Sequence, residues 1–113
     1  MNILNNHVKQ KIKEHSLNET PRECCGLILD IGGEIEVLRC KNVAKDNKKN
    51  FRIDEIDYLN ASKRGSIKAY YHSHPHDEVG RFSGADAQVS RAQNIPLIMY
   101  SIFHDNFYQL DHE

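Results

Sequence analysis

The chain is organised around residues 70–86, which read Tyr-Tyr-His-Ser-His-Pro-His-Asp-Glu-Val-Gly-Arg-Phe-Ser-Gly-Ala-Asp. The apolar, β-branched and aromatic residues that lead into the first histidine favour a β-strand. Side chains alternate between the two faces of a strand, so His72 and His74 are predicted to share one face and Ser73 to point to the other. Pro75 has no N–H for a sheet hydrogen bond, and it favours an extended conformation in the residue before it. The strand should therefore end where the second imidazole is presented.

A carboxylate follows the histidines after a short loop. The residues Ser83-Gly84-Ala85-Asp86 are typical of a helix start, with serine at the cap and an acid in the first turn. Two neutral imidazoles and one carboxylate are ligands that zinc accepts, and three protein ligands leave a position for water, as in catalytic zinc sites. A His-x-His pair also occurs on surface strands without a metal, and Ser83 has a complete structural role as a helix cap. The full spacing nevertheless favours a zinc (Zn2+) site formed by His72, His74 and Asp86.

This spacing resembles a known signature. His72-Ser73-His74-Pro75, followed by seven residues and then Ser83-Gly84-Ala85-Asp86, is similar to the His-x-His-Pro-x7-Ser-x-x-Asp pattern of the JAMM metalloproteases, the catalytic branch of the MPN domains. Members of that family also carry a glutamate near the start of a buried upstream strand. The segment Pro21-Arg22-Glu23-Cys24-Cys25-Gly26-Leu27-Ile28 resembles the corresponding segment in bacterial and phage members.

The resemblance implies a role for each matching residue. His72, His74 and Asp86 would bind the zinc ion, and Glu23 would act as general acid and base on the water that the zinc activates. Ser83 would donate a hydrogen bond to the developing oxyanion. Taken alone, Glu23 has the character of a solvated surface acid, so its assignment depends on the family pattern.

The resemblance also implies a fold and a setting. The implied fold is the MPN fold, an α/β domain similar to the zinc deaminases, with a mixed, mostly antiparallel sheet flanked by helices. The deaminases themselves pair a His-x-Glu with a downstream Pro-Cys-x-x-Cys, and this sequence has neither. The phrase Phe51-Arg52-Ile53-Asp54-x-x-Asp57-Tyr58 is similar to one in the JAMM-type domains at the amino end of tail assembly proteins from long-tailed phages.

Length and composition indicate a single globular domain over residues 1–113, with 39% hydrophobic and 27% charged residues. The net charge of -1 gives no general attraction to nucleic acid or anionic lipid. The basic run from Lys41 to Arg52 is interrupted by Asp46 and several amides, so it is predicted to be a solvated connection. No export segment or membrane span is evident, which predicts a cytoplasmic protein, in the host cytoplasm if phage-encoded, or a component of the virion tail. The cysteines Cys24, Cys25 and Cys40 are predicted to be buried or half-buried, and reduced.

Periodicity and turn residues predict the order of the elements. An amphipathic helix over 3–15 is followed by a hairpin of strands 24–31 and 34–40 around Gly32-Gly33. A second helix runs from its cap Asp54 to about Lys63 and ends at Gly65. It is predicted to bury Ile56, Tyr58 and Leu59. After the histidine strand come a helix over 85–93, a strand over 97–103 and a last strand over 107–110.

These features predict a zinc-dependent peptidase or isopeptidase that hydrolyses a peptide or isopeptide bond in a protein or peptide partner. The partner could be a phage tail component or a ubiquitin-like protein. Two alternatives stay open: a non-catalytic, zinc-containing assembly component of a phage tail, and a processing enzyme for a ubiquitin-like sulfur carrier. A nucleophilic enzyme has little support, because no positioned base is evident beside Cys24 or Cys25.

Overall fold

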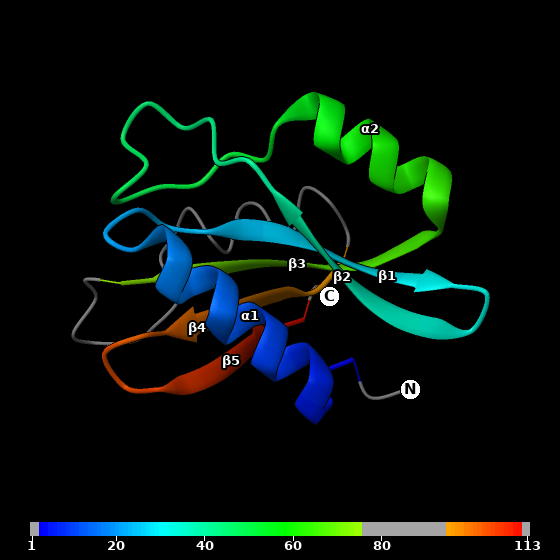
Figure 1. The fold of residues 1–113 in the computed structure, drawn as a ribbon, viewed down its shortest axis with the longest axis horizontal. Coiled ribbons are helices and arrows are strands. Elements are labelled where there is room, and N and C mark those ends of the chain that lie inside the picture. The colour runs from blue at the N-terminus through cyan, green and yellow to red at the C-terminus, as the bar shows by residue number, and fades with distance from the viewer. Residues whose placement is uncertain (1–2, 76–94, 112–113) are drawn as a thin grey trace.

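The structure is a computed structural model that describes residues 3–75 and 95–111. Within these residues it contains a five-stranded sheet and two helices (Figure 1). In chain order the elements are α1 (Asn6–Glu19), β1 (Cys25–Ile31), β2 (Glu34–Cys40), α2 (Glu55–Arg64), β3 (Ser66–His74), β4 (Leu97–Ser101) and β5 (Asn106–Leu110). Neither helix combines the length and the apolar character needed to cross a bilayer.

The strands lie in the order β2-β1-β3-β4-β5. Every neighbouring pair is antiparallel except β3 and β4, which run parallel. The α/β class with a mixed, mostly antiparallel sheet is therefore confirmed. β3 lies at the centre, so the side chains at its carboxyl end are enclosed by a strand on each side.

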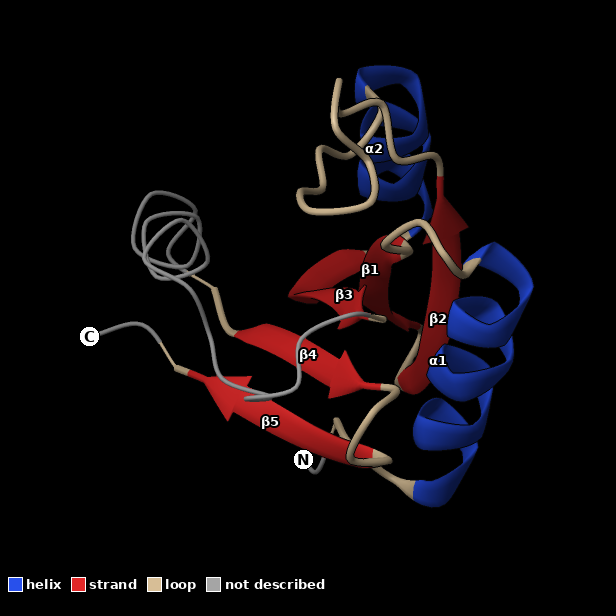
Figure 2. Ribbon diagram, turned by 90° about the vertical axis from the view of Figure 1, so that its left-hand side faces the viewer, coloured by secondary structure: helices blue, strands red, loops and turns tan. Residues whose placement is uncertain are grey.

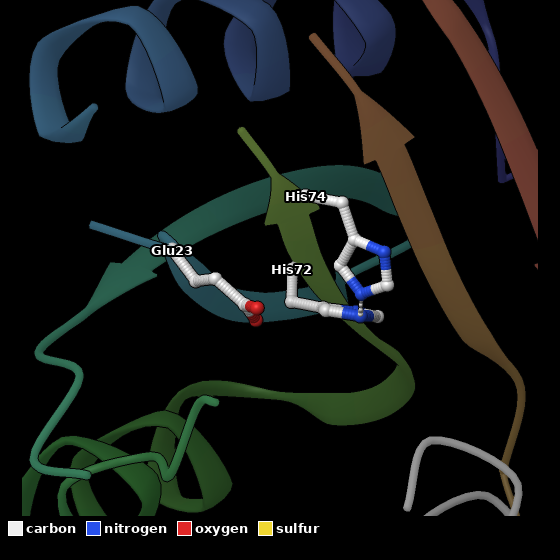
Figure 3. Close-up of side chains that lie close together, drawn as sticks. All are labelled: Glu23, His72 and His74. Atoms are coloured by element: carbon white, nitrogen blue, oxygen red, sulfur yellow. Dashed lines mark hydrogen bonds between the residues drawn. The ribbon is translucent and has the colours of Figure 1, made fainter. Parts of the chain in front are cut away.

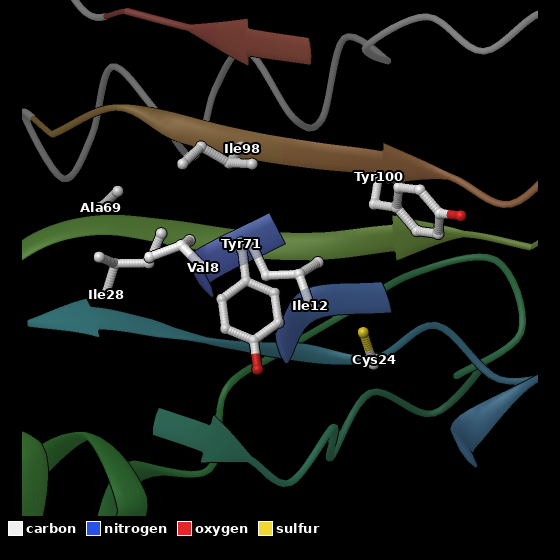
Figure 4. Close-up of a cluster of buried hydrophobic side chains, with 8 residues drawn as sticks. All are labelled: Val8, Ile12, Cys24, Ile28, Ala69, Tyr71, Ile98 and Tyr100. Atoms are coloured by element: carbon white, nitrogen blue, oxygen red, sulfur yellow. The ribbon is translucent and has the colours of Figure 1, made fainter. Parts of the chain in front are cut away.

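The helices cover opposite faces of the sheet. Val8 and Ile12 of α1 pack into an apolar cluster on one face, which we call the α1 face (Figure 4). Ala61 of α2 packs into a second cluster on the other face, the α2 face. Alternation along β1 supplies both clusters, because Ile28 belongs to the first and Leu27 to the second. Figure 2 shows the two helices as separate elements against the sheet.

The hairpin between β1 and β2 is confirmed. Gly32 and Gly33 both have positive φ, at 61° and 93°, a conformation that other residues rarely adopt. Gly33 donates its N–H to Oδ1 of Asp30 at 2.9 Å. Two consecutive positive φ values match the twist of antiparallel strands, so the turn fixes the register of the pair.

α1 begins three residues later and ends four residues later than predicted. Asn5 is its N-cap, and Oδ1 of Asn5 accepts a hydrogen bond from the N–H of Val8 at 2.9 Å. The helix continues to Glu19 because Ser16, although polar, is buried and donates to the carbonyl of Lys13 at 2.8 Å. A cap and a satisfied hydroxyl therefore outweigh the apolar pattern that placed the helix at 3–15.

α2 has the predicted bounds, but the predicted burial of its side chains is wrong. Ile56 and Leu59 are 67% and 53% exposed, and Tyr58 is 38% exposed. The helix meets the sheet through Ala61, which is fully buried, and through Tyr58, which stacks on Tyr70 with ring centroids 6.4 Å apart. Residues two positions apart in a helix are rotated by about 200°, so they lie on nearly opposite sides. Ile56 is two positions from Tyr58, and Leu59 is two positions from Ala61. Ile56 and Leu59 therefore lie on the solvent side.

Smaller predictions differ in their bounds. Asp54 occupies the N-cap of α2 without a side-chain capping bond, and just before it Ile53 forms an isolated β-bridge with Asn42. β4 ends at Ser101, before a turn in which Asp105 has a φ of 48°. The helix predicted over 85–93 lies outside the described residues.

Candidate metal centre

The two histidines of the sequence motif converge at the end of β3. Their Nε2 atoms are 2.9 Å apart, and their rings meet edge to face with centroids 4.7 Å apart (Figure 3). Ser73 points to the opposite face, where its Oγ accepts a hydrogen bond from the N–H of Cys24 at 2.9 Å. The predicted alternation of His72, Ser73 and His74 is confirmed.

Glu23 reaches the histidines from the start of β1. Cys25 pairs with His72 in the antiparallel register, and the N–H of Ser73 donates to the carbonyl of Cys24 at 3.1 Å. Cys24 belongs to the cluster on the α1 face, so the residue before it projects to the α2 face. Strand pairing thus places a carboxylate from residue 23 beside imidazoles about 50 residues later in the sequence.

The three side chains form a compact set of metal-binding groups. One donor atom from each of Glu23, His72 and His74 lies within 4.8 Å of the others, and all three residues are buried. Zinc binds nitrogen and oxygen at about 2.0–2.2 Å, so donors that share one ion lie within about 4 Å of each other. The Nε2 separation of 2.9 Å satisfies this limit. Imidazole nitrogen and carboxylate oxygen are also ligand types that zinc accepts. The chemistry of the group therefore fits zinc.

An aromatic ring supports one of the imidazoles. Phe51 stacks on His72, with ring centroids 4.5 Å apart and an angle of 24° between the planes. His72 is fully buried, so this contact restricts the orientation of its ring. No local sequence pattern indicated that Phe51 reaches the site, although the phrase that contains Phe51 was part of the family resemblance.

The connection between β2 and α2 also reaches the site. The basic residues of this connection are exposed, as predicted. The carbonyl of Asn47 nevertheless accepts a hydrogen bond from the N–H of Glu23 at 2.7 Å. The side-chain amide of Asn42 donates to the carbonyl of Glu23 at 2.9 Å. Both contacts link segments that no local pattern connects, so inspection of the sequence could not find them.

The cysteines have no evident chemical role at this site. Cys24, Cys25 and Cys40 are buried and form no disulfide, as predicted. Burial raises the pKa of Cys24 and of Cys40 to about 12 and raises the pKa of Cys25 well above its usual value. Thiols in this state are protonated and are poor nucleophiles and poor metal ligands.

The remaining predicted site residues, Ser83 and Asp86, lie outside the described residues. Their roles as hydrogen-bond donor and third ligand stay predictions. Among the described residues, the structure brings together Glu23, His72 and His74, which are the predicted proton carrier and two of the predicted ligands.

Comparison with known proteins gives a matching family and a related protein. The family Prok-JAB, described as prokaryotic homologs of the JAB domain, matches residues 5–111. The Tail tip assembly protein K of Escherichia phage N15 is 33% identical over 64 residues, which cover 57% of this chain and 26% of that protein. The aligned region thus spans about a quarter of this relative's length. With the family match running over nearly the whole sequence and through every described element, the chain belongs to the prokaryotic homologs of the JAB domain.

Proposed function

We propose that the protein is a zinc-dependent hydrolase that cleaves a peptide or isopeptide bond in a partner protein. The supporting observation is the buried group of Glu23, His72 and His74, whose donor atoms lie within 4.8 Å of one another on one face of the sheet. Two imidazoles and a carboxylate can hold a metal and move a proton, and the JAB family membership agrees with such a site. A phage tail protein and a ubiquitin-like protein are the partner classes we propose.

Each residue has a separate task in this proposal. His72 and His74 hold the metal through Nε2, and Asp86 is the proposed third ligand. Zinc, when bound, supplies the Lewis acidity that polarises a carbonyl and acidifies water. Glu23 accepts a proton from the attacking water and passes it to the leaving nitrogen as the C–N bond breaks, which returns the carboxylate to its initial state. Ser83 donates a hydrogen bond to the oxygen that becomes negatively charged.

The test is Glu23→Gln, which keeps the size of the side chain and removes its ability to carry a proton. We expect this variant to retain zinc and to lose hydrolysis by about 10²–10⁴-fold. Each neighbouring gene product is co-expressed with the wild type or the variant, and its intact mass is measured. Glu14→Gln is the matched control, because Glu14 is an exposed acid on α1. Loss of zinc in Glu23→Gln would reassign Glu23 as a ligand.

A second candidate function is assembly of a phage tail without catalysis. The observation that favours it is the 33% identity to the Tail tip assembly protein K of Escherichia phage N15. In this case a tail protein would form a stable, zinc-dependent complex with the wild type and with Glu23→Gln alike. The mass of the tail protein would be the same after co-expression with the wild type and with Glu23→Gln. That combination would reject hydrolysis and support the assembly role.

A further inference from the structure

The side chain of Asn42 connects two parts of the candidate site. Its Nδ2 donates to the carbonyls of Glu23 and Asn50, both at 2.9 Å, and lies 3.5 Å from the carbonyl of Asn47. Its Oδ1 accepts from the N–H groups of Ala44 at 3.1 Å and Arg52 at 3.0 Å. A primary amide offers two N–H donors and two acceptor lone pairs, so each is used here. The partners also fix the orientation of the amide, because the carbonyls lie on one side of it and the two N–H groups on the other.

The first connection holds the backbone of Glu23. β1 begins at Cys25, so Glu23 lies just before the paired strand. Its N–H donates to the carbonyl of Asn47 and its carbonyl accepts from Asn42. Both backbone polar groups of Glu23 are therefore bound by the loop of residues 41–53. This loop fixes the point from which the carboxylate reaches the histidines.

The second connection holds the ring that lies on His72. Asn50 and Arg52 are the two sequence neighbours of Phe51, and Asn42 bonds to both. The N–H of Val43 also donates to the carbonyl of Arg52 at 2.8 Å, which closes the loop against itself. Phe51 is thus fixed on either side while its ring stacks on His72 at 4.5 Å.

We propose that Asn42 is a positioning residue. Through Phe51 it holds the ring of His72, a proposed metal ligand, and so affects the metal affinity of the site. Through the backbone of Glu23 it fixes the position of the proposed proton carrier. Groups that orient metal ligands from outside the coordination sphere typically change metal affinity by 10–100-fold when mutated. The role requires an amide: a carboxylate at this position would direct oxygen atoms at two carbonyl oxygens and lose both donors. Any effect of Asn42 on hydrolysis rests on the proposed function, whereas the hydrogen bond between Asn42 and Glu23 does not.

The experiment compares Asn42→Asp with Asp57→Ala. The control removes the hydrogen bond of 2.8 Å that the N–H of Lys41, at the start of the same loop, donates to Asp57 of α2. Two properties are measured: zinc affinity by competition with a chelator, and hydrogen exchange of the Glu23 amide by NMR. We expect Asn42→Asp to weaken zinc binding by about 10–100-fold and to accelerate exchange at Glu23 about tenfold. The control should change neither by more than about threefold.

Phe51→Leu tests the second connection and provides a variant that does not depend on the folding of Asn42→Asp. It keeps an apolar side chain and removes the ring stacked on His72, so we expect an altered visible spectrum of the Co²⁺-substituted protein and weaker zinc binding. Unchanged zinc affinity in both Asn42→Asp and Phe51→Leu would overturn the proposal. If the wild type binds zinc but cleaves no partner, the proposed hydrolysis is rejected. The zinc affinities of the variants still test the positioning role of Asn42. If the wild type binds no zinc, unchanged exchange at Glu23 in Asn42→Asp would overturn the connection.

Discussion

The two faces of the sheet receive side chains from the same strand and use them differently. On the α1 face, β3 contributes Tyr71 and Ser73, which lie in or beside a closed apolar cluster. On the α2 face, the same end of β3 contributes His72 and His74, which meet a carboxylate. The register of β3 therefore places the packing residues on one face and the candidate metal ligands on the other. A shift of the strand by one residue would exchange the two sets of side chains.

A third buried histidine sharpens this comparison. His15 of α1 lies on the α1 face, where its Nδ1 forms a hydrogen bond with the hydroxyl of Tyr71 at 2.7 Å. Burial, aided by the charge of Arg39, lowers the pKa of His15 to about 4. This imidazole is neutral and bound to a protein hydroxyl, whereas those of His72 and His74 point at each other. Convergence with other donors, and not burial, distinguishes the candidate ligands.

The largest effect on stability should come from the α1 face. Ile12 is fully buried in its cluster, so Ile12→Ala should lower the free energy of unfolding by about 2–5 kcal/mol. Chemical denaturation measures this loss. Zinc bound per folded chain should stay unchanged, because Ile12 and the histidines lie on opposite faces. A loss of zinc from the folded variant would show that the two faces are not independent.

Protonation of His15, which also lies on the α1 face, should lower the free energy of unfolding by a smaller amount. The pKa of His15 is lowered to about 4 in the folded protein from about 6.5 in the unfolded chain, so the unfolded chain binds the proton more tightly. The associated stability is present above pH 6.5 and is lost as the pH falls toward 4. A full shift corresponds to about 3 kcal/mol, and partial access of water reduces it to about 2 kcal/mol.

Unfolding of metal-free protein at a series of pH values measures this loss. His15→Asn can keep a hydrogen bond to Tyr71 and does not titrate, so its stability should depend less on pH over this range. Identical pH profiles for the two proteins would assign the acid sensitivity to other groups.

The smallest effect should come from the outer side of α2. Leu59 is 53% exposed, so Leu59→Ser should change the free energy of unfolding by no more than about 0.5 kcal/mol. Thermal or chemical unfolding is sufficient to measure it. A loss above about 1 kcal/mol would place Leu59 in a packed interface.

Local patterns were sufficient for part of the architecture. Alternation around His72, the glycines at 32 and 33 and the proline at 75 predicted the hairpin, the histidine face and the end of β3. The orientation of α2 could not be predicted, because its ten residues carry apolar side chains on opposite sides. Ile56 and Leu59 lie on one side, Tyr58 and Ala61 on the other, and only contact with the sheet selects between them.

The supports of the candidate site depend on contacts between distant segments. Asn42 lies 19 residues from Glu23 along the chain, and its neighbours have the composition of an ordinary polar loop. Phe51 likewise lies far from His72 in sequence. No periodicity encodes such contacts, so the sequence predicted the groups of the centre and not the residues that hold them.

The zinc content of three proteins tests the central claim most directly. Wild type, His74→Ala and His15→Asn are purified alike, and zinc per chain is measured by elemental analysis after exposure to a stoichiometric amount of the metal. The claim predicts about one zinc per chain in the wild type and in His15→Asn, and a large loss in His74→Ala. Equal zinc in the wild type and His74→Ala, or an equal loss in both variants, would contradict it.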